Sequence, residues 1–305
     1  MFIDNNKIIR YQKPDISMRD LLEPALLKYS DFSCEGSFVS LIMWCRCYNH
    51  QVAFEDNQVY IRVGEHCENL FLLPFGEDIK TGVDRMIYTC NTLCNKPALF
   101  LTSEGTRFER FKELYGDSFE ITPSRDDYEY IYRRTDLAEL AGRKYHSKRN
   151  HITAFSKAYQ WSYEEINDTN LSDVLSMSEE WYRKRKEEDP ENTLETEHEA
   201  ISYILKHREE LRVMGGLIRA DGKVVAFTYG SPINSRVLDV HVEKALPEFR
   251  EAYTVINMEF AAHVPDSYIY LNREDDMGLE GLRKAKLSYK PEILLEKYIC
   301  RQKDF

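Results

Sequence analysis

Hydrophobic residues follow two different periods along the chain, and the period changes several times between segments. Alternating hydrophobic and polar residues predict β-strands, whereas hydrophobic residues three and four apart predict helices. In the first half we expect strands at 51–55, 58–63, 69–73, 98–102 and 118–121. Helices are expected there at 78–95 and 104–115. The dipeptide Asp56-Asn57 separates the first two strands, so the first three strands should form a meander.

The second half has longer periodic segments. A strand at 128–133 either closes the first half or crosses to the second. Helices are expected at 136–141, 144–159, 171–186, 195–207, 248–263 and 279–286. Strands are expected at 211–220, 223–231, 236–242, 267–271 and 293–300. Asp221-Gly222 separates two of these strands and is a strong hairpin signal, so three consecutive strands should form an antiparallel meander.

Length and element order together predict the architecture. A chain of 305 residues exceeds the usual size of one hydrophobic core, so we expect two domains, 1–134 and 135–305. The second has the order helix, helix, three strands, helix, strand, helix, strand, which is typical of Gcn5-related acyltransferase (GNAT) domains. The first shows a looser version of this order without a sequence repeat. We therefore predict an α/β protein with mixed sheets, built from two tandem GNAT-like domains.

The composition is that of an ordinary globular protein, with 43% hydrophobic and 30% charged residues. The longest strongly apolar stretch, 38–45, is far shorter than the roughly 20 residues that cross a bilayer. The N-terminus lacks the charged-then-apolar order of a secretory signal. The seven cysteines form no C-x-x-C pair and no zinc-binding pattern, so we expect buried free thiols and no metal site. These features predict a cytoplasmic protein without a transmembrane segment.

Charge is distributed unevenly along the chain. The net charge of -11 disfavours a protein whose whole surface binds nucleic acid or anionic lipid, because long-range repulsion opposes the encounter. Between residues 133 and 157, however, seven basic residues accompany only two acidic residues. Arginine and lysine donate charge-assisted hydrogen bonds to phosphate oxygens. This segment is therefore either a phosphate-binding helix or a solvated face that balances acids elsewhere.

Residues 272–286 form the strongest candidate site, because the segment follows a predicted strand and opens a helix. Its two glycines permit close approach of the backbone to a ligand. Arg283 and Lys286 are three residues apart on the helix, so they share a face that suits one phosphate group. Asp276 is either the N-cap of this helix or a group that orients or deprotonates a nucleophile. If Arg283 instead ties the helix to a neighbouring acid, its replacement should lower stability and leave binding unchanged.

Several catalytic motifs are absent from the sequence. His241-Val242-Glu243 matches the H-x-E of zinc deaminases, but the required P-C-x-x-C is missing. There is no G-x-S-x-G, no G-K-[ST] loop and no G-x-G-x-x-G. Serine-hydrolase, P-loop and dinucleotide-binding functions therefore have no support.

Three stretches together resemble one protein family: 144–152, then 241–245 with 253–261, and finally 272–291. The last stretch, with its G-L-R-x-A-K-x-S-Y-x-P ending, is the most specific. The chain is similar over nearly its whole length to an uncharacterised bacterial family related to the C-terminal domain of the phosphatidylglycerol lysyltransferases. The resemblance implies two tandem acetyltransferase-like folds, shared more distantly with Fem-type ligases, which take their amino acid from aminoacyl-tRNA.

The three similar stretches supply the candidate site residues. In the lysyltransferases, a lysine at the position of Lys286 belongs to the phosphate-binding part of the site. We expect Asp276 or Glu243 to act as the catalytic base. The residues expected to bind substrate or phosphate are Lys148, Arg149, Asn150, Lys244, Tyr253, Asn257, Asn272, Arg283, Lys286 and Tyr289.

These features favour an acyl or aminoacyl transferase that joins an activated ester, such as aminoacyl-tRNA, to an amine or hydroxyl acceptor at the domain junction. The phosphate-bearing partner would be the tRNA acceptor end or a similar ligand, and the acceptor a small molecule, a peptide or a lipid head group. A coenzyme A-dependent N-acetyltransferase is the alternative enzyme, although the start of the 248–263 helix lacks the Q/R-x-x-G-x-G/A loop that binds the coenzyme pyrophosphate. A non-catalytic binding module with a transferase fold is the third alternative.

Overall fold

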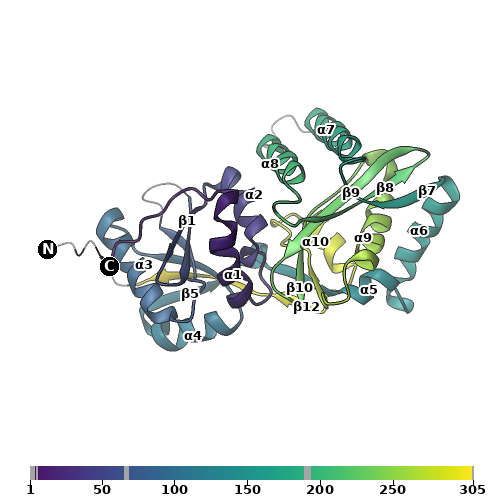
Figure 1. The fold of residues 1–305 in the computed structure, drawn as a ribbon. Helices are drawn as coiled ribbons and strands as arrows, with labels where there is room; N and C mark the ends of the chain where they lie inside the picture. Colours follow the sequence, from purple (N-terminus) through teal and green to yellow (C-terminus); the bar gives the residue numbers. More distant parts are fainter. Residues whose placement is uncertain (1–3, 5, 65–68, 189–193, 304–305) are drawn as a thin grey trace.

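The computed structural model describes residues 4, 6–64, 69–188 and 194–303. Figure 1 shows two α/β units side by side, each built around one mixed β-sheet. The first sheet contains, in spatial order, β1 (Gln51–Glu55), β2 (Gln58–Val63), β3 (Leu70–Leu72), β4 (Leu99–Ser103), β13 (Lys297–Gln302) and β5 (Phe119–Pro123). The second contains, in spatial order, β12 (Ile293–Leu295), β6 (Glu129–Arg133), β11 (Tyr270–Asn272), β10 (Val237–Ala245), β9 (Lys223–Pro232), β8 (Met214–Ala220) and β7 (Trp161–Glu165). The predicted α/β fold class is confirmed.

Both predicted meanders are confirmed. β1, β2 and β3 pair in sequence as antiparallel neighbours, and so do β8, β9 and β10. Asp56 and Asn57 have φ angles of 51° and 57°, and Asp221 and Gly222 have φ angles of 48° and 86°. Two successive positive φ angles are typical of the type I′ turn, whose twist matches that of the strands it joins.

The described helices include two, α1 and α2, that hydrophobic periodicity does not predict. The helices are α1 (Arg19–Tyr29), α2 (Phe38–Tyr48), α3 (Ile79–Cys94), α4 (Thr106–Tyr115), α5 (Arg134–Glu139), α6 (His146–Ala158), α7 (Leu171–Glu188), α8 (Leu194–Lys206), α9 (Ala252–His263) and α10 (Glu280–Leu287). With α1 and α2 included, the order of helices and strands from α1 to β6 is the same as the order from α7 to β13, whereas α5, α6 and β7 have no counterpart in the first unit. The repeat of element order is therefore fuller than the sequence predicts.

The two units exchange strands. β6 follows β5 along the chain but lies in the second sheet, antiparallel to β11 and β12. β13 follows β12 but lies in the first sheet, antiparallel to β4 and β5, and Figure 1 shows this yellow segment running into the other unit. The strand expected at 128–133 therefore crosses to the second sheet. The prediction of one strand at 293–300 is wrong, because Glu296 separates two strands that pair in different sheets.

Helix α2 is buried between the two units. Ser37 caps its N-terminus by accepting a hydrogen bond from the Ser40 amide, and Asn49 ends it with a φ angle of 51°. Its buried residues share one hydrophobic core with α1, α7, α8 and both sheets. A helix that is apolar on nearly all sides shows no amphipathic period, which explains why the sequence indicates only an apolar stretch here.

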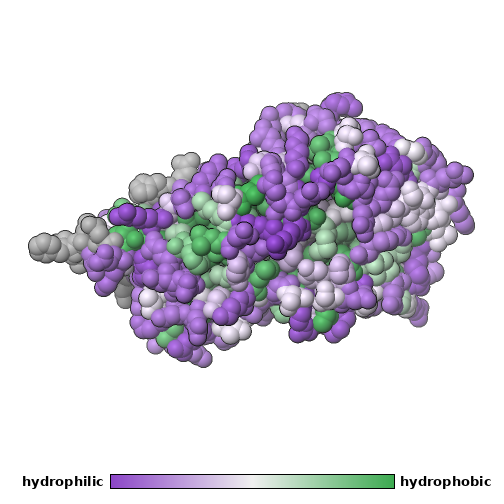
Figure 2. Space-filling model, viewed as in Figure 1, coloured by the Kyte–Doolittle hydropathy of each residue, from purple (hydrophilic) through white to green (hydrophobic). Residues whose placement is uncertain are grey.

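The remaining helices cover the outer faces of the sheets. α3 and α4 pack on the first sheet, whereas α5, α6 and α9 pack on the face of the second sheet that lies opposite α2, α7 and α8. In the part of the chain that the structure describes, no helix is long and apolar enough to cross a bilayer. Figure 2 shows a mainly hydrophilic surface on the viewed face, with hydrophobic residues in small separate groups.

Candidate active site

A β-bulge in β10 fixes the direction of several candidate residues. In the ladder with β9, Val240 pairs with Gly230 and Val242 pairs with Tyr229, so His241 is an extra residue in β10. A bulge leaves one residue unpaired and re-aims the side chains that follow it.

Because of the bulge, His241 and Glu243, which are two residues apart in β10, point to opposite faces of the sheet. His241 contacts Ser40 of α2, and Val242 joins the core that contains α2. Glu243 points to the other face, where Asn257 of α9 donates a hydrogen bond to it. Without the extra residue, strict alternation would put Glu243 on the same face as His241. The bulge therefore separates two polar sites.

Six side chains on the α9 face form what we call the central cluster: Tyr132, Lys148, Glu243, Asn257, Arg273 and Tyr289. Arg273 lies at its centre, directly after β11. The guanidinium carbon of Arg273 is 5.6 Å from the ring centroid of Tyr132 and 4.9 Å from that of Tyr289. Arginine stacks well on aromatic faces, so the two rings hold the guanidinium in one orientation.

Glu243 is fixed by two donors of the central cluster. Arg273 Nη2 donates to Glu243 Oε1 at 2.9 Å, and Asn257 Nδ2 donates to Glu243 Oε2 at 3.1 Å. The side chains of Arg273 and Glu243 are each 12% exposed. Burial alone would lower the pKa of Arg273, but the Glu243 carboxylate outweighs this effect and raises the pKa. The guanidinium is therefore charged at every physiological pH.

Lys148 reaches the cluster from α6. Its Nζ atom lies 3.6 Å from the ring centroid of Tyr289. Burial, together with the positive charge of Arg273, lowers the pKa of Lys148 to about 8. At neutral pH most molecules carry a charged amine here, next to a second positive charge. Because the Glu243 carboxylate balances one of these two positive charges, one net positive charge remains to attract an anion.

Two buried atoms of the central cluster have no hydrogen-bond partner among the described residues: Arg273 Nη1 and Asn257 Oδ1. Asn257 is only 4% exposed. Buried polar atoms in native proteins are nearly always paired, because an unpaired one costs free energy. An unpaired donor and an unpaired acceptor near a half-buried lysine therefore indicate a place for a polar ligand.

Lys286 holds the loop that carries Arg273 of the central cluster. Its Nζ atom donates to the backbone carbonyl oxygen of Arg273 at 2.5 Å and also to that of Asp275. Lys286 is 9% exposed, and burial together with Arg273 lowers its pKa. At least two of its three N–H groups are thus used to hold the loop. Its role in binding phosphate stays a prediction.

Asp276 and its donors form a separate group, which we call the Asp276 anchor. Arg283 donates to both carboxylate oxygens at 2.8 Å, Tyr130 donates at 2.5 Å, and the Gly278 amide donates at 3.0 Å. The Asp276 side chain is fully buried. Burial alone would raise the pKa of Asp276, but these donors, above all Arg283, hold the pKa below its usual range. These contacts favour an anchoring role, and a catalytic role for Asp276 stays a prediction.

Residues with left-handed backbone angles shape the loop that carries both Arg273 and Asp276. Glu274 and Met277 have φ angles of 55° and 52°, and Gly278 has a φ angle of 71°. Such angles are costly for residues other than glycine, so the surrounding contacts must hold them. The loop thereby turns Arg273 and Asp276 to different partners although they are three residues apart.

Five other predicted residues lie outside the central cluster, and one of them, Asn272, is described with the junction below. Arg149 donates to the backbone carbonyl oxygens of Leu140 and Gly142, and Asn150 is exposed next to His146. Arg149 therefore holds the end of α5. The other two predicted residues, Lys244 and Tyr253, are described next.

Lys244 points to the α8 face. Its Nζ atom lies 3.0 and 3.1 Å from the carboxylate oxygens of Glu197 and 3.9 Å from the ring centroid of Trp181. Tyr253 also interacts with Trp181, and burial raises the pKa of Tyr253. The structure therefore does not bring these two residues to the central cluster.

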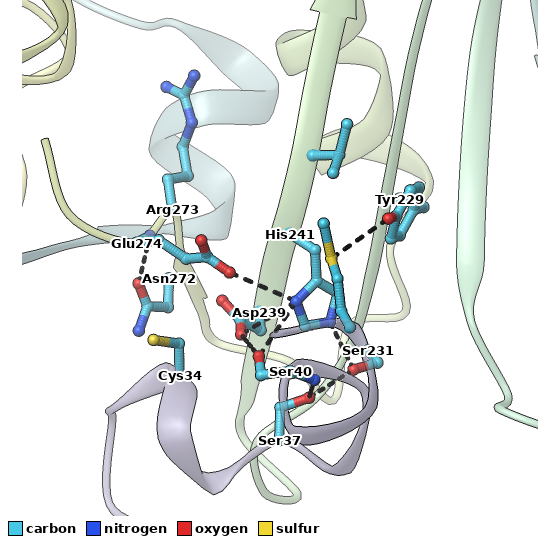
Figure 3. A network of polar contacts seen from close by, with 12 residues as sticks. Cys34, Ser37, Ser40, Tyr229, Ser231, Asp239, His241, Asn272, Arg273 and Glu274 are labelled. Carbon is cyan, nitrogen blue, oxygen red and sulfur yellow. Dashed lines mark hydrogen bonds and ion pairs between the residues drawn. The ribbon is translucent and has the colours of Figure 1, made fainter. Parts of the chain in front are cut away.

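A second polar site lies on the α2 face, at the junction of the two units (Figure 3). His241 Nε2 lies 2.8 Å from Ser231 Oγ, which lies 2.9 Å from Ser37 Oγ. His241 Nδ1 lies 3.4 Å from both Asp239 Oδ2 and Glu274 Oε1. The members of this network come from α2, β9, β10 and the loop after β11. Some of them lie near the motif segments, but no local pattern in the sequence indicates that they come together.

The exchanged strands contribute a buried ion pair beside this network. Lys297 of β13 pairs with Glu129 of β6 and with Glu35. The predicted site residue Asn272 donates to the same Glu129 and to the Phe32 carbonyl oxygen. Burial raises the pKa of Glu35 despite Lys297, whereas Lys297 and Asn272 outweigh burial and lower the pKa of Glu129. Asn272 therefore holds the junction rather than the central cluster.

Comparison with known proteins identifies relatives over the whole fold. A conserved protein of unknown function from Bacteroides thetaiotaomicron is 35% identical, with a TM-score of 0.89 over 97% of this chain and 100% of that chain. The structure of L-PGS from Bacillus licheniformis matches with a TM-score of 0.66 at 13% identity, over 96% of this chain and 94% of that chain.

Sequence comparison agrees with the structural match. An uncharacterised protein from Mycoplasmoides gallisepticum is 23% identical over 201 residues, which are 62% of this chain and 63% of that protein. Residues 28–301 match the family model described as "Phosphatidylglycerol lysyltransferase, C-terminal". This match includes both sheets and every residue of the central cluster, and the chain therefore belongs to the phosphatidylglycerol lysyltransferase C-terminal family of aminoacyl transferases.

Proposed function

We propose that this chain transfers an aminoacyl group from aminoacyl-tRNA to an amine or hydroxyl acceptor, and that the central cluster is the site of transfer. The family supports group transfer of this kind. An aminoacyl ester is already activated, so the protein has only to align donor and acceptor, move one proton and stabilise an oxyanion. Such a donor places the protein in the cytoplasm.

The observation that carries the proposal is the unpaired Nη1 of Arg273, for which the described residues provide no acceptor. The guanidinium is charged, oriented by two aromatic rings and largely shielded from water. A fixed donor of this kind stabilises negative charge better than water does, because it needs no reorganisation during the reaction. The carbonyl oxygen of an ester fits this position.

In the proposed step, the acceptor nitrogen or oxygen attacks the ester carbonyl carbon and the bond to the ribose oxygen breaks. Arg273 Nη1 donates to the carbonyl oxygen as negative charge develops. Glu243 accepts the proton of the acceptor, and that proton then passes to the ribose oxygen. Asn257 and Arg273 hold both oxygens of Glu243 in place, so the carboxylate does not need to be ordered when substrate binds.

Lys148 suits the phosphate of the tRNA end. Its amine is half-buried and adjoins the positive charge of Arg273, so a phosphate oxygen would relieve the repulsion between them. The acceptor is proposed as a small molecule, a peptide or a lipid head group that carries a free amine or hydroxyl.

The test is transfer of radiolabelled amino acids from charged tRNA to pools of lipid, peptide and small-amine acceptors. We expect labelled product with the parent chain and a rate roughly 100-fold lower for Arg273→Gln, the usual effect of removing one oxyanion donor. Arg133→Gln is the matched control, because Arg133 pairs with Glu292 on the surface.

Two outcomes would contradict the proposal. Micromolar binding of acetyl-CoA with acetyl transfer, and no transfer from charged tRNA, would assign the site to a coenzyme A-dependent enzyme. Full complementation of a deletion strain by a chain with both Glu243→Gln and Asp276→Asn would assign it to a binding module.

A further inference from the structure

The junction network contains a group of ligand atoms that the proposed transfer does not use. Cys34 Sγ, one carboxylate oxygen of Asp239 and one of Glu274 lie within 4.8 Å of one another. Cys34 belongs to the turn before α2, Asp239 to β10, and Glu274 to the loop after β11. In Figure 3 the two carboxylates approach His241 from the same side, above Cys34.

Two oxygens in this group are buried without a hydrogen-bond partner among the described residues: Asp239 Oδ1 and Glu274 Oε1. The Asp239 side chain is fully buried, and its other oxygen accepts a hydrogen bond from Ser40 at 3.1 Å. His241 Nδ1 lies 3.4 Å from Asp239 Oδ2 and from Glu274 Oε1, so a single ring nitrogen faces both acids. Two unpaired carboxylate oxygens this close together require a cation or a shared proton between them.

In the part of the chain that the structure describes, the buried lysine of the junction, Lys297, is already paired with other acids. Lys297 pairs with Glu35 and Glu129, so the related group formed by Cys34, Glu35 and Glu129 has its counter-ion. Among the described residues, neither Asp239 nor Glu274 forms an ion pair with a lysine or arginine; the basic side chain that faces both is His241.

We propose that Cys34, Asp239 and Glu274 bind a divalent transition-metal ion of the zinc type at the junction of the two units. One sulfur and two carboxylate oxygens suit zinc, whose bonds are about 2.3 Å to sulfur and about 2.0 to 2.2 Å to oxygen. The three ligand atoms lie within 4.8 Å of one another, so side-chain rotations that move each atom by about 1 Å would bring all three to these bond lengths from one ion. A thiolate favours a metal ion over the ammonium group of an organic ligand.

Metal binding replaces the thiol proton. Cys34 Sγ now donates to Glu129 Oε1 at 3.3 Å, so binding breaks this contact, forms the sulfur–metal bond and releases one proton to solvent. His241 Nδ1 faces Asp239 Oδ2, an arrangement in which an imidazole orients a ligating carboxylate. The ion would tie the segment before α2 to the second sheet, and this role does not depend on the proposed transfer.

The experiment uses the full chain after treatment with a chelator, titrated with zinc in a calorimeter and with cobalt in an absorbance spectrometer. We expect one ion per chain, a sulfur-to-cobalt charge-transfer band, and a melting temperature that rises by roughly 5 °C at 100 times Kd. Cys34→Ser should abolish the band, and Asp239→Asn should weaken affinity by about tenfold or more.

Two matched controls should bind as the parent does. Cys47→Ser removes a half-buried thiol from α2, and Glu259→Gln removes a carboxylate whose side chain is 19% exposed, against 17% for Glu274. Failure of the parent to bind one ion, or unchanged binding by Cys34→Ser, would overturn the proposal. If the parent binds no zinc and Asp239→Asn melts at a higher temperature than the parent, then Asp239 and Glu274 share a proton. This result would also overturn the proposal.

Discussion

The Asp276 anchor and the central cluster both pair an arginine with a buried carboxylate, yet they differ in how completely the pair is satisfied. In the anchor, Asp276 accepts hydrogen bonds at both oxygens from Arg283, Tyr130 and the backbone. In the central cluster, Arg273 binds Glu243 but leaves Nη1 unpaired in the described structure. A satisfied pair holds the fold together, whereas an unsatisfied one is ready for a ligand.

The largest expected effect is on Arg273. Arg273→Gln removes the proposed oxyanion donor, so transfer at saturating donor should fall by roughly 100-fold. Because Glu243 also loses its ion pair, a melting curve must accompany the rate. If the folded variant transfers at a rate near that of the parent, Arg273 is not part of the transfer site, and its role does not differ from that of Arg283.

Lys148 should show a smaller effect with a specific pH dependence. Lys148→Met should weaken donor binding by about tenfold, the loss of one charge-assisted hydrogen bond to phosphate. Because its pKa is about 8, the amine is charged below that pH and neutral above it. Donor affinity of the parent should therefore fall as pH rises through about 8, whereas the variant should lack this step.

The control for this prediction is Lys144→Met, which removes a surface lysine that pairs with Asp136. Binding isotherms between pH 7 and pH 9 should show the same step for this control as for the parent. A step that persists in Lys148→Met would assign the titration to another group.

The smallest expected effect on transfer is that of Arg283→Ala. It should lower the melting temperature by several degrees, because Asp276 stays buried without its main donor. Transfer should stay within about twofold of the parent once the protein is folded. Weaker donor binding with an unchanged melting temperature would restore Arg283 to the phosphate site.

The acid dependence of stability sharpens this prediction. The pKa of Asp276 is lowered in the folded chain, so its stabilising contribution is present above the usual aspartate value of about 3.9 and is lost as pH falls below it. The difference in melting temperature between the parent and Asp276→Asn should therefore be full at pH 7 and shrink below about pH 4. A constant difference would mean that the carboxylate charge does not matter.

Local sequence patterns predict the regular part of the fold. Alternation and turn residues such as Asp56-Asn57 are enough for both meanders, because strands and tight turns depend on neighbours in the chain. The same patterns miss α2, which is buried on nearly all sides, and they join β12 and β13 into one strand. The exchange of strands depends on contacts between the two units.

The candidate site is predicted only in part for the same reason. Lys148, Glu243, Asn257 and Tyr289 come together as candidates from separate stretches, but Arg273 is missed although it lies inside the strongest segment. Helical spacing favours Arg283, whereas the direction of Arg273 depends on left-handed residues in the loop. The bulge that separates Glu243 from His241 is also a property of pairing between strands and not of either strand alone.

The most direct test compares two conservative variants, Arg273→Lys and Arg283→Lys, in single-turnover transfer from charged tRNA at saturating protein. Both keep the positive charge, and each loses the planar fork that makes two hydrogen bonds. We predict transfer roughly 100-fold slower for Arg273→Lys and within about twofold of the parent for Arg283→Lys. The reverse order, or transfer by Arg273→Lys at the parent rate, would contradict the assignment of the central cluster as the site of transfer.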